Sequence, residues 1–130
     1  MDFKNANELL ALCEEKNLPI SEIMRIREIE LGETDAEVVN QKMTRVLEIM
    51  KDAALSPISQ PVKSMGGLIG GEARKLSLHA QKKEGLCGDL LQKAVTYAMA
   101  TLETNASMGL IVASPTAGSA GIVPGLMLAM

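Results

Sequence analysis

Apolar residues recur at helical spacing along most of this 130-residue chain, and no segment alternates apolar and polar positions as a strand does. The pattern therefore predicts an all-α fold, a single multi-helix domain over residues 1–130. The predicted helices cover residues 5–16, 21–31, 34–55, 72–83 and 89–103, and a further apolar helix is expected from residue 120 onward.

Polar residues are placed to cap the first three helices. Asn5 stands three residues before Glu8, and Thr34 stands three residues before Glu37, which is the spacing of a capping box. Ser21 is expected to cap the second helix.

Two of the predicted helices carry an apolar stripe that we expect to face a core. The stripe on the third helix would also suit a helix of a partner protein, and the spacing leaves that alternative open. The stripes consist of Ala36, Val39, Met43, Val46, Met50 and Ala53 on the third helix, and of Leu91, Ala94, Val95, Ala98 and Leu102 on the helix over 89–103.

Prolines and glycines interrupt the helical pattern between Ser56 and Gly71. Pro57 and Pro61 precede two pairs of adjacent glycines, so the segment is predicted to be a long loop. Long loops in compact domains are often functional.

The chain carries no charged residue from Thr104 to Met130. A membrane span needs roughly 20 apolar residues in succession, and Pro115, Pro124 and several glycines interrupt this tail. We therefore expect no membrane segment but a helix buried in a larger helical domain that continues beyond Met130.

Small and hydroxyl-bearing residues fill the stretch between Ser114 and Gly125. Pro115 favours an extended Ser114, and Ser119 is expected to cap a helix that begins at Ala120. The free N–H groups of such a helix start, with nearby hydroxyls, would suit a small carboxylate or phosphate. An ordinary turn between helices is the alternative.

Composition excludes several classes of function. The chain is 47% apolar but only 2% aromatic, and its net charge is −3, so it lacks the basic and stacking residues of a nucleic-acid-binding protein. Cys13 and Cys87 form no metal-binding or disulfide pattern, and the N-terminus shows no secretory signal. A cytoplasmic protein with reduced thiols is therefore expected.

Few residues suggest catalysis by themselves. Glu72 stands where a phosphate-binding loop needs a lysine. The single histidine, His79, is expected to be a partly buried structural residue. Lys75 follows the glycine-rich loop by one helical turn, and it could either reach an anion there or be solvated.

Three motifs in order carry a resemblance to a known family: residues 70–73 with Lys75, residues 105–109, and the Pro-Thr-Ala-Gly-Ser-Ala-Gly-x-x-Pro-Gly run of residues 115–125. Together they resemble the N-terminal part of the α subunit of the iron-sulfur-dependent L-serine dehydratases. The resemblance extends over essentially the whole chain and is strongest from Ser64 onward.

The resemblance implies that the complete enzyme deaminates L-serine to pyruvate and ammonia, with a [4Fe-4S] cluster as Lewis acid on the substrate hydroxyl. It identifies no general base, and it does not decide between serine and threonine. The residues that it places around the substrate are Ser64, Gly67, Gly70, Gly71, Lys75, Asn105, Thr116, Ala117, Gly118 and Ser119.

The resemblance also implies that the cysteine ligands of the cluster lie in the sequence that would follow Met130. Cys13 and Cys87 fall outside the matching motifs, so we expect this chain to hold no cluster and to be inactive alone. The implied partners are L-serine, the remainder of the α domain and a separate β subunit, with a homo-oligomer left open.

A different class of function stays open beside this one. A non-catalytic helical protein could bind a partner through the apolar tail and the stripe on the third helix.

Overall fold

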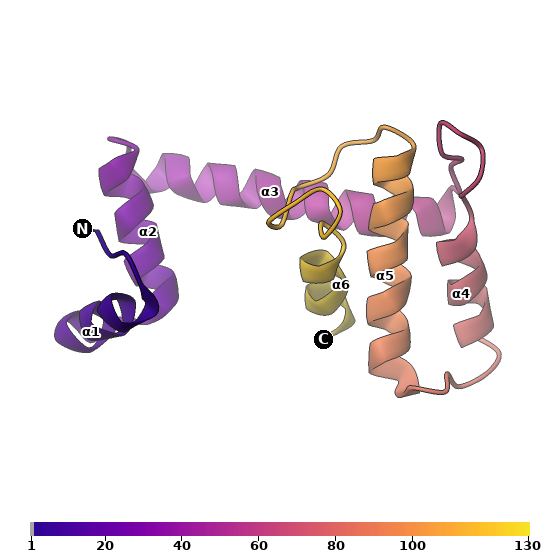
Figure 1. Cartoon of the computed structure of the whole chain (residues 1–130), viewed down its shortest axis with the longest axis horizontal. Coiled ribbons are helices and arrows are strands. Elements are labelled where there is room, and N and C mark those ends of the chain that lie inside the picture. Colours follow the sequence, from indigo (N-terminus) through magenta and orange to yellow (C-terminus); the bar gives the residue numbers. More distant parts are fainter. Residues whose placement is uncertain (1) are drawn as a thin grey trace. The chain divides into compact units, whose positions relative to one another are not determined.

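The computed structural model describes residues 2–130, and within that range it contains six α-helices and no strand (Figure 1). The all-α prediction is therefore confirmed. The helices are α1 (Ala6–Lys16), α2 (Ile20–Leu31), α3 (Ala36–Ser59), α4 (Glu72–Ala80), α5 (Gly88–Ala106) and α6 (Ile122–Ala129).

The chain divides into two compact units, Met1–Arg45 and Val46–Met130. Helix α3 begins in the first unit and ends in the second. The expectation of one domain stays a prediction.

In the first unit, α1 packs against α2, and its start is capped as the sequence predicts. The Asn5 side-chain oxygen accepts a hydrogen bond from the Glu8 backbone N–H at 3.0 Å. The Asn5 Nδ2 group donates in turn to Glu8 Oε1 at 2.8 Å. These bonds satisfy one of the free N–H groups at the helix start.

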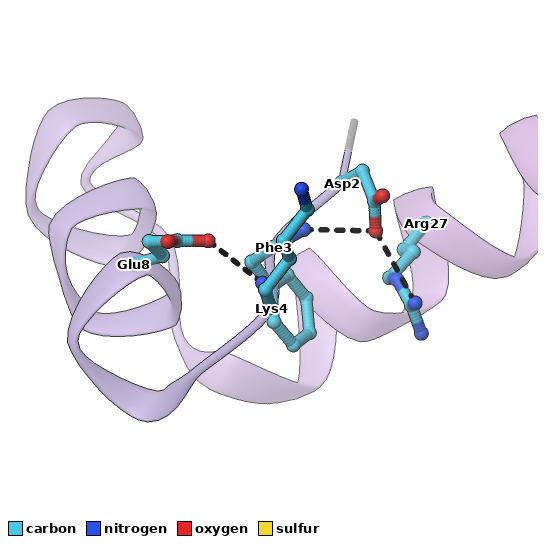
Figure 2. A network of polar contacts seen from close by, with 5 residues as sticks. All are labelled: Asp2, Phe3, Lys4, Glu8 and Arg27. Atoms are coloured by element: carbon cyan, nitrogen blue, oxygen red, sulfur yellow. Dashed lines mark hydrogen bonds and ion pairs between the residues drawn. The ribbon is translucent and has the colours of Figure 1, made fainter.

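The segment before α1 is held against α2 by Arg27 (Figure 2). The guanidinium carbon of Arg27 lies 4.8 Å from the centre of the Phe3 ring, and its Nη2 donates to Asp2 Oδ1 at 3.3 Å. The backbone N–H of Lys4 donates to Glu8 Oε2 at 2.7 Å. The single phenylalanine of the chain thus serves as a stacking surface for a cation.

Two predicted caps in this unit are wrong by one or two residues. Ser21 lies inside α2, which begins at Ile20 with Pro19 at the cap position and no side-chain cap. The fixed φ of proline suits a helix start, so the helix needs no serine there. At α3, the Asp35 carboxylate and not the Thr34 hydroxyl accepts the N–H of Val38, at 3.0 Å.

The prediction that a loop begins at Ser56 is also wrong, because α3 continues through Pro57 to Ser59. Proline lacks the N–H that would bond to Ala53 O in this helix. Thr104 of α5 supplies the missing donor: its Oγ1 lies 2.8 Å from Ala53 O, closer than the 3.2 Å to Ala100 O in its own helix. Pro57 is fully buried at this contact.

In the second unit, α5 lies between α4 and α6 (Figure 1). Small residues allow α6 to approach α5 closely. A Cβ added at Gly125 would lie 2.8 Å from Ala94 O, and one added at Gly121 would lie 3.0 Å from the Cα of Ala98. Close backbone packing of this kind explains how a chain almost without aromatic residues forms a core.

The predicted apolar stripes describe the buried faces only in part. On α5, Ala94 is buried but Leu91 is 49% exposed, and on α3, Met50 and Ala53 are buried but Met43 is 62% exposed. Periodicity identifies an apolar face but does not say which neighbour covers it. The residues of α5 that are buried are Ala94, Thr96, Ala100, Thr101 and Glu103.

Two further helix predictions need correction. Helix α4 ends at Ala80 and not near Lys83. Helix α6 begins at Ile122 and not at Ala120, so Ser119 does not cap it. None of the helices formed by residues 2–130 is both long and apolar enough to cross a membrane.

We predict that Thr104→Val lowers the free energy of unfolding by about 1–3 kcal/mol, because the substitution leaves the buried Ala53 carbonyl without a donor. Urea denaturation measures the loss, and Thr104→Ser, which keeps the hydroxyl, is the matched control. In a Pro57→Ala background the new N–H can donate to Ala53 O, so Thr104→Val should cost less there. An equal cost in both backgrounds would refute this explanation of the buried proline.

Candidate functional site

The last turn of α5, Glu103–Ala106, makes hydrogen bonds to both long loops of the second unit. In Figure 1 the α5–α6 loop leaves the upper end of α5, and the α3–α4 loop lies above the start of α4. We call residues 64–71 the glycine loop and residues 114–119 the hydroxyl loop. Together these three segments contain nine of the ten residues that the sequence places at the substrate.

The carboxylate of Glu103 connects α5 to the start of α4. Its Oε2 accepts the N–H of Gly71 at 3.1 Å, and its Oε1 accepts the N–H of Ala73 at 2.8 Å. Glu103 is only 4% exposed. A buried carboxylate is stable when N–H donors satisfy both oxygens and a helix N-terminus favours its charge.

A second carboxylate lies beside it. Glu72 Oε2 accepts the N–H of Gly70 at 2.7 Å. Hydrogen bonds from the backbone N–H groups of Glu72 and Gly70 hold the pKa of Glu72 below its ordinary value of 4.5. Partial burial raises this pKa, and the nearby charge of Lys75 lowers it. Glu72 is therefore ionised well below neutral pH.

The glycine loop closes on itself and on α5. Ser64 N–H donates to Ile69 O at 2.8 Å, and the Ser64 hydroxyl accepts the N–H of Ile69 at 3.2 Å. The N–H of Met65 donates to Ala106 O at 3.1 Å. Ser64 therefore holds the loop closed, and α5 holds the loop in place.

Glycine is required at two positions of this loop for different reasons. Gly67 and Gly70 both have positive φ angles, 69° and 146°. A Cβ added at Gly67 would meet no atom within 4 Å, whereas one added at Gly70 would collide with the backbone carbonyl of Val62. Gly70 thus packs closely against the backbone of Val62 and Lys63, which precede the loop.

The hydroxyl loop is held by Ser119. Its hydroxyl donates to Ser114 O at 2.9 Å and accepts the N–H of Thr116 at 3.2 Å. The hydroxyls of Thr116 and Ser119 lie 2.9 Å apart. Both hydroxyls therefore serve the turn itself. The peptide bond between Ser114 and Pro115 is cis.

Asn105 joins the hydroxyl loop to α5. Its Nδ2 lies 3.5 Å from Ala117 O, at the outer limit of a hydrogen bond. Ala117 and Gly118 are exposed at the tip of the loop. Among residues 2–130 no acceptor is bonded to the N–H group of either residue.

The structure therefore brings most of the predicted site residues together around one helix end. Lys75 lies apart, exposed on α4 one turn after Glu72. His79 is exposed as well, so its prediction as a partly buried residue is wrong. Glu103 was missed by sequence reasoning, although it is the last charged residue before an uncharged tail and so a visible anomaly.

The side chains of residues 2–130 do not fit an iron-sulfur cluster. Cluster ligation requires several thiolates close together, but Cys13 belongs to the first unit and Cys87 is exposed in the second. Nowhere between residues 2 and 130 do three or more His, Cys, Asp or Glu side chains gather as metal ligands would.

Comparison with known proteins agrees with the motifs. Residues 15–130 match the family model described as serine dehydratase alpha chain. The chain is 42% identical over 128 residues to a probable L-serine dehydratase, alpha chain, of Bacillus subtilis. It is 35% identical over 127 residues to an L-serine dehydratase, alpha chain, of Peptoniphilus asaccharolyticus.

Each alignment covers 98% of this chain, but only 42% of the Bacillus protein and 44% of the Peptoniphilus protein. This chain thus spans less than half the length of these two relatives. An L-serine dehydratase of Streptomyces coelicolor is 30% identical over 129 residues, which are 96% of this chain and 27% of that protein. No solved structure matches significantly.

We predict that Gly70→Ala destabilises the second unit by about 2 kcal/mol or more, because a Cβ there collides with backbone. Gly67→Ala is the matched control: it has a positive φ but open space, so about 1 kcal/mol is expected. Chemical denaturation followed by far-UV circular dichroism compares the two. Equal costs would mean that the close approach at Gly70 does not constrain the loop.

We predict that Glu72→Gln lowers stability at neutral pH and that the difference from wild type vanishes in acid. The pKa of Glu72 is lower in the folded chain than in the unfolded chain, so ionised Glu72 stabilises the fold above pH 4.5. That contribution is lost as the pH falls through the folded-state pKa. Urea midpoints of both proteins from about pH 7 to about pH 3 test this; a pH-independent difference would contradict it.

Proposed function

Because the chain belongs to the serine dehydratase alpha chain family, we propose that it forms the substrate-positioning part of an enzyme that deaminates L-serine to pyruvate and ammonia. In this reaction the α-proton and the β-hydroxyl leave as water, and the resulting enamine tautomerises and is hydrolysed to pyruvate and ammonia. The family does not distinguish serine from threonine as the preferred substrate.

One observation carries the proposal. The last turn of α5 joins the glycine loop through Ala106 O and Met65 N–H, and joins the hydroxyl loop through Asn105 and Ala117. Two motifs that are some fifty residues apart in sequence thus reach one helix end. Residues that act on one small substrate must converge in this way.

Within this arrangement we assign the substrate carboxylate to the tip of the hydroxyl loop. Ala117 and Gly118 are exposed residues, and their N–H groups have no acceptor within residues 2–130. Two adjacent N–H groups suit a small carboxylate. The Asn105 amide would orient the substrate, and the glycine loop from Ser64 to Gly71 would form the opposite wall.

We assign activation of the hydroxyl and removal of the α-proton to other parts of the complete enzyme. Because the side chains described here do not fit an iron-sulfur cluster, the [4Fe-4S] cluster and the base that removes the α-proton are proposed to lie elsewhere in the complete enzyme. Two relatives are named alpha chain and are more than twice as long as this chain. These names support the remainder of an α chain and a β subunit as partners.

The free thiols of Cys13 and Cys87 suit a reducing compartment such as the cytoplasm.

A second candidate function rests on the exposed apolar side chains of α6 and α3. Ile122, Leu126 and Met127 of α6 are each more than half exposed, as is Met43 of α3. A non-catalytic partner-binding protein would present such surfaces. The remainder of a longer α chain would cover them equally well, so only an activity measurement distinguishes the two functions.

We predict that a complete α chain carrying this sequence, reconstituted anaerobically with its β subunit, releases pyruvate from L-serine. The 130-residue chain treated in the same way should release none, because its residues do not fit the cluster. Lactate dehydrogenase coupling measures the pyruvate. An inactive complete enzyme would favour the partner-binding function, and turnover by the 130-residue chain would refute the division of roles proposed above.

A further inference from the structure

Glu103 is a buried charged residue that no motif assigns to the site. Although it belongs to α5, both oxygens of its carboxylate accept N–H groups from the glycine loop and the start of α4, those of Gly71 and Ala73. At 4% exposure it has little access to water. Removing the N–H groups that bind this carboxylate would therefore lower the free energy of unfolding.

The bonds to Glu103 change what the start of α4 can do. Free N–H groups at a helix N-terminus ordinarily attract anions. Here Glu103 occupies the N–H groups of Gly71 and Ala73, and Glu72 occupies that of Gly70. A substrate carboxylate would find these donors already used, so the start of α4 is a fixed wall and not an anion site.

The glycine loop has little conformational preference of its own. Gly67, Gly70 and Gly71 all adopt positive φ angles, and glycine loses more backbone freedom on ordering than any other residue. The position of the loop therefore depends on anchors outside it. The α5 helix supplies two: Ala106 O, which accepts the N–H of Met65, and the Glu103 carboxylate.

We propose that Glu103 is a positioning residue: its carboxylate fixes the glycine loop at the geometry that the substrate requires, without contacting the substrate itself. The inference rests on the proposed function, because it concerns the same site. Of the two anchors that α5 supplies, the Glu103 carboxylate is the one that we expect to determine where the glycine loop lies.

Two conservative variants test the contact. Glu103→Gln keeps one acceptor oxygen but turns an NH₂ group toward a backbone N–H, so one of the two bonds is lost. Glu103→Asp keeps the carboxylate on a side chain one methylene shorter. Thr104→Val is the matched control, since it removes a buried hydrogen bond from the same turn but contacts α3 and not the glycine loop.

In the complete enzyme we expect Glu103→Gln to lower kcat/KM for L-serine roughly tenfold to a hundredfold, mainly through a higher KM. A displaced glycine loop weakens substrate binding and so raises KM. The reacting groups lie elsewhere in the enzyme, so kcat changes less. Thr104→Val should change KM by less than about twofold, even if it lowers the melting temperature by a similar amount. An unchanged KM in a folded Glu103→Gln enzyme, or an equal rise in Thr104→Val, would overturn the proposal.

A measurement independent of activity uses amide hydrogen exchange on the 130-residue chain. The N–H groups of Gly71 and Ala73 should both exchange slowly in the wild type. The one that loses its acceptor in Glu103→Gln should exchange at least tenfold faster, while that of Ala100 inside α5 stays unchanged. Unaltered exchange would refute the contact. Absence of pyruvate from the wild-type enzyme would instead refute the proposed function, so the two failures are distinguishable.

Discussion

The bond between the Glu103 carboxylate and the backbone of Gly71 and Ala73 is the interaction on which the second unit depends. Placing a carboxylate at 4% exposure costs several kcal/mol unless donors satisfy it. The start of a helix offers such donors together with a favourable dipole. These two bonds tie the start of α4 to the last turn of α5.

The neighbours of Glu103 extend this arrangement in other directions. Successive residues of an α-helix point about 100° apart, because one turn contains 3.6 residues. One turn of α5 therefore reaches each surrounding segment once: Glu103 bonds to α4, Thr104 to α3, and Asn105 to the hydroxyl loop. The carbonyl of Ala106, left free at the helix end, accepts from the glycine loop. Loops distant in sequence are thereby held by four consecutive residues.

Much of this could be predicted from the sequence, and the reasons for the failures are physical. Helix periodicity and the Asn5 cap are local, so they are read correctly from neighbouring residues. In the sequence Pro57 indicates a loop, because a residue without an N–H normally ends a helix. The donor that replaces this N–H comes from Thr104, 47 residues away. The sequence predicts that Ser119 caps a helix, but its hydroxyl donates to Ser114 O within the loop. The motifs located most of the site, whereas Glu103 was missed because its role depends on a contact across 30 residues of chain.

The central claim is that the last turn of α5 gathers the glycine loop and the hydroxyl loop into one serine site. A crystal structure of the complete enzyme with L-serine or an unreactive analogue bound tests it most directly. The claim predicts the ligand carboxylate at the N–H groups of Ala117 and Gly118, with Asn105 within hydrogen-bonding distance and the glycine loop opposite. A ligand bound away from the end of α5, or at the N-terminus of α4 in place of Glu103, would contradict it.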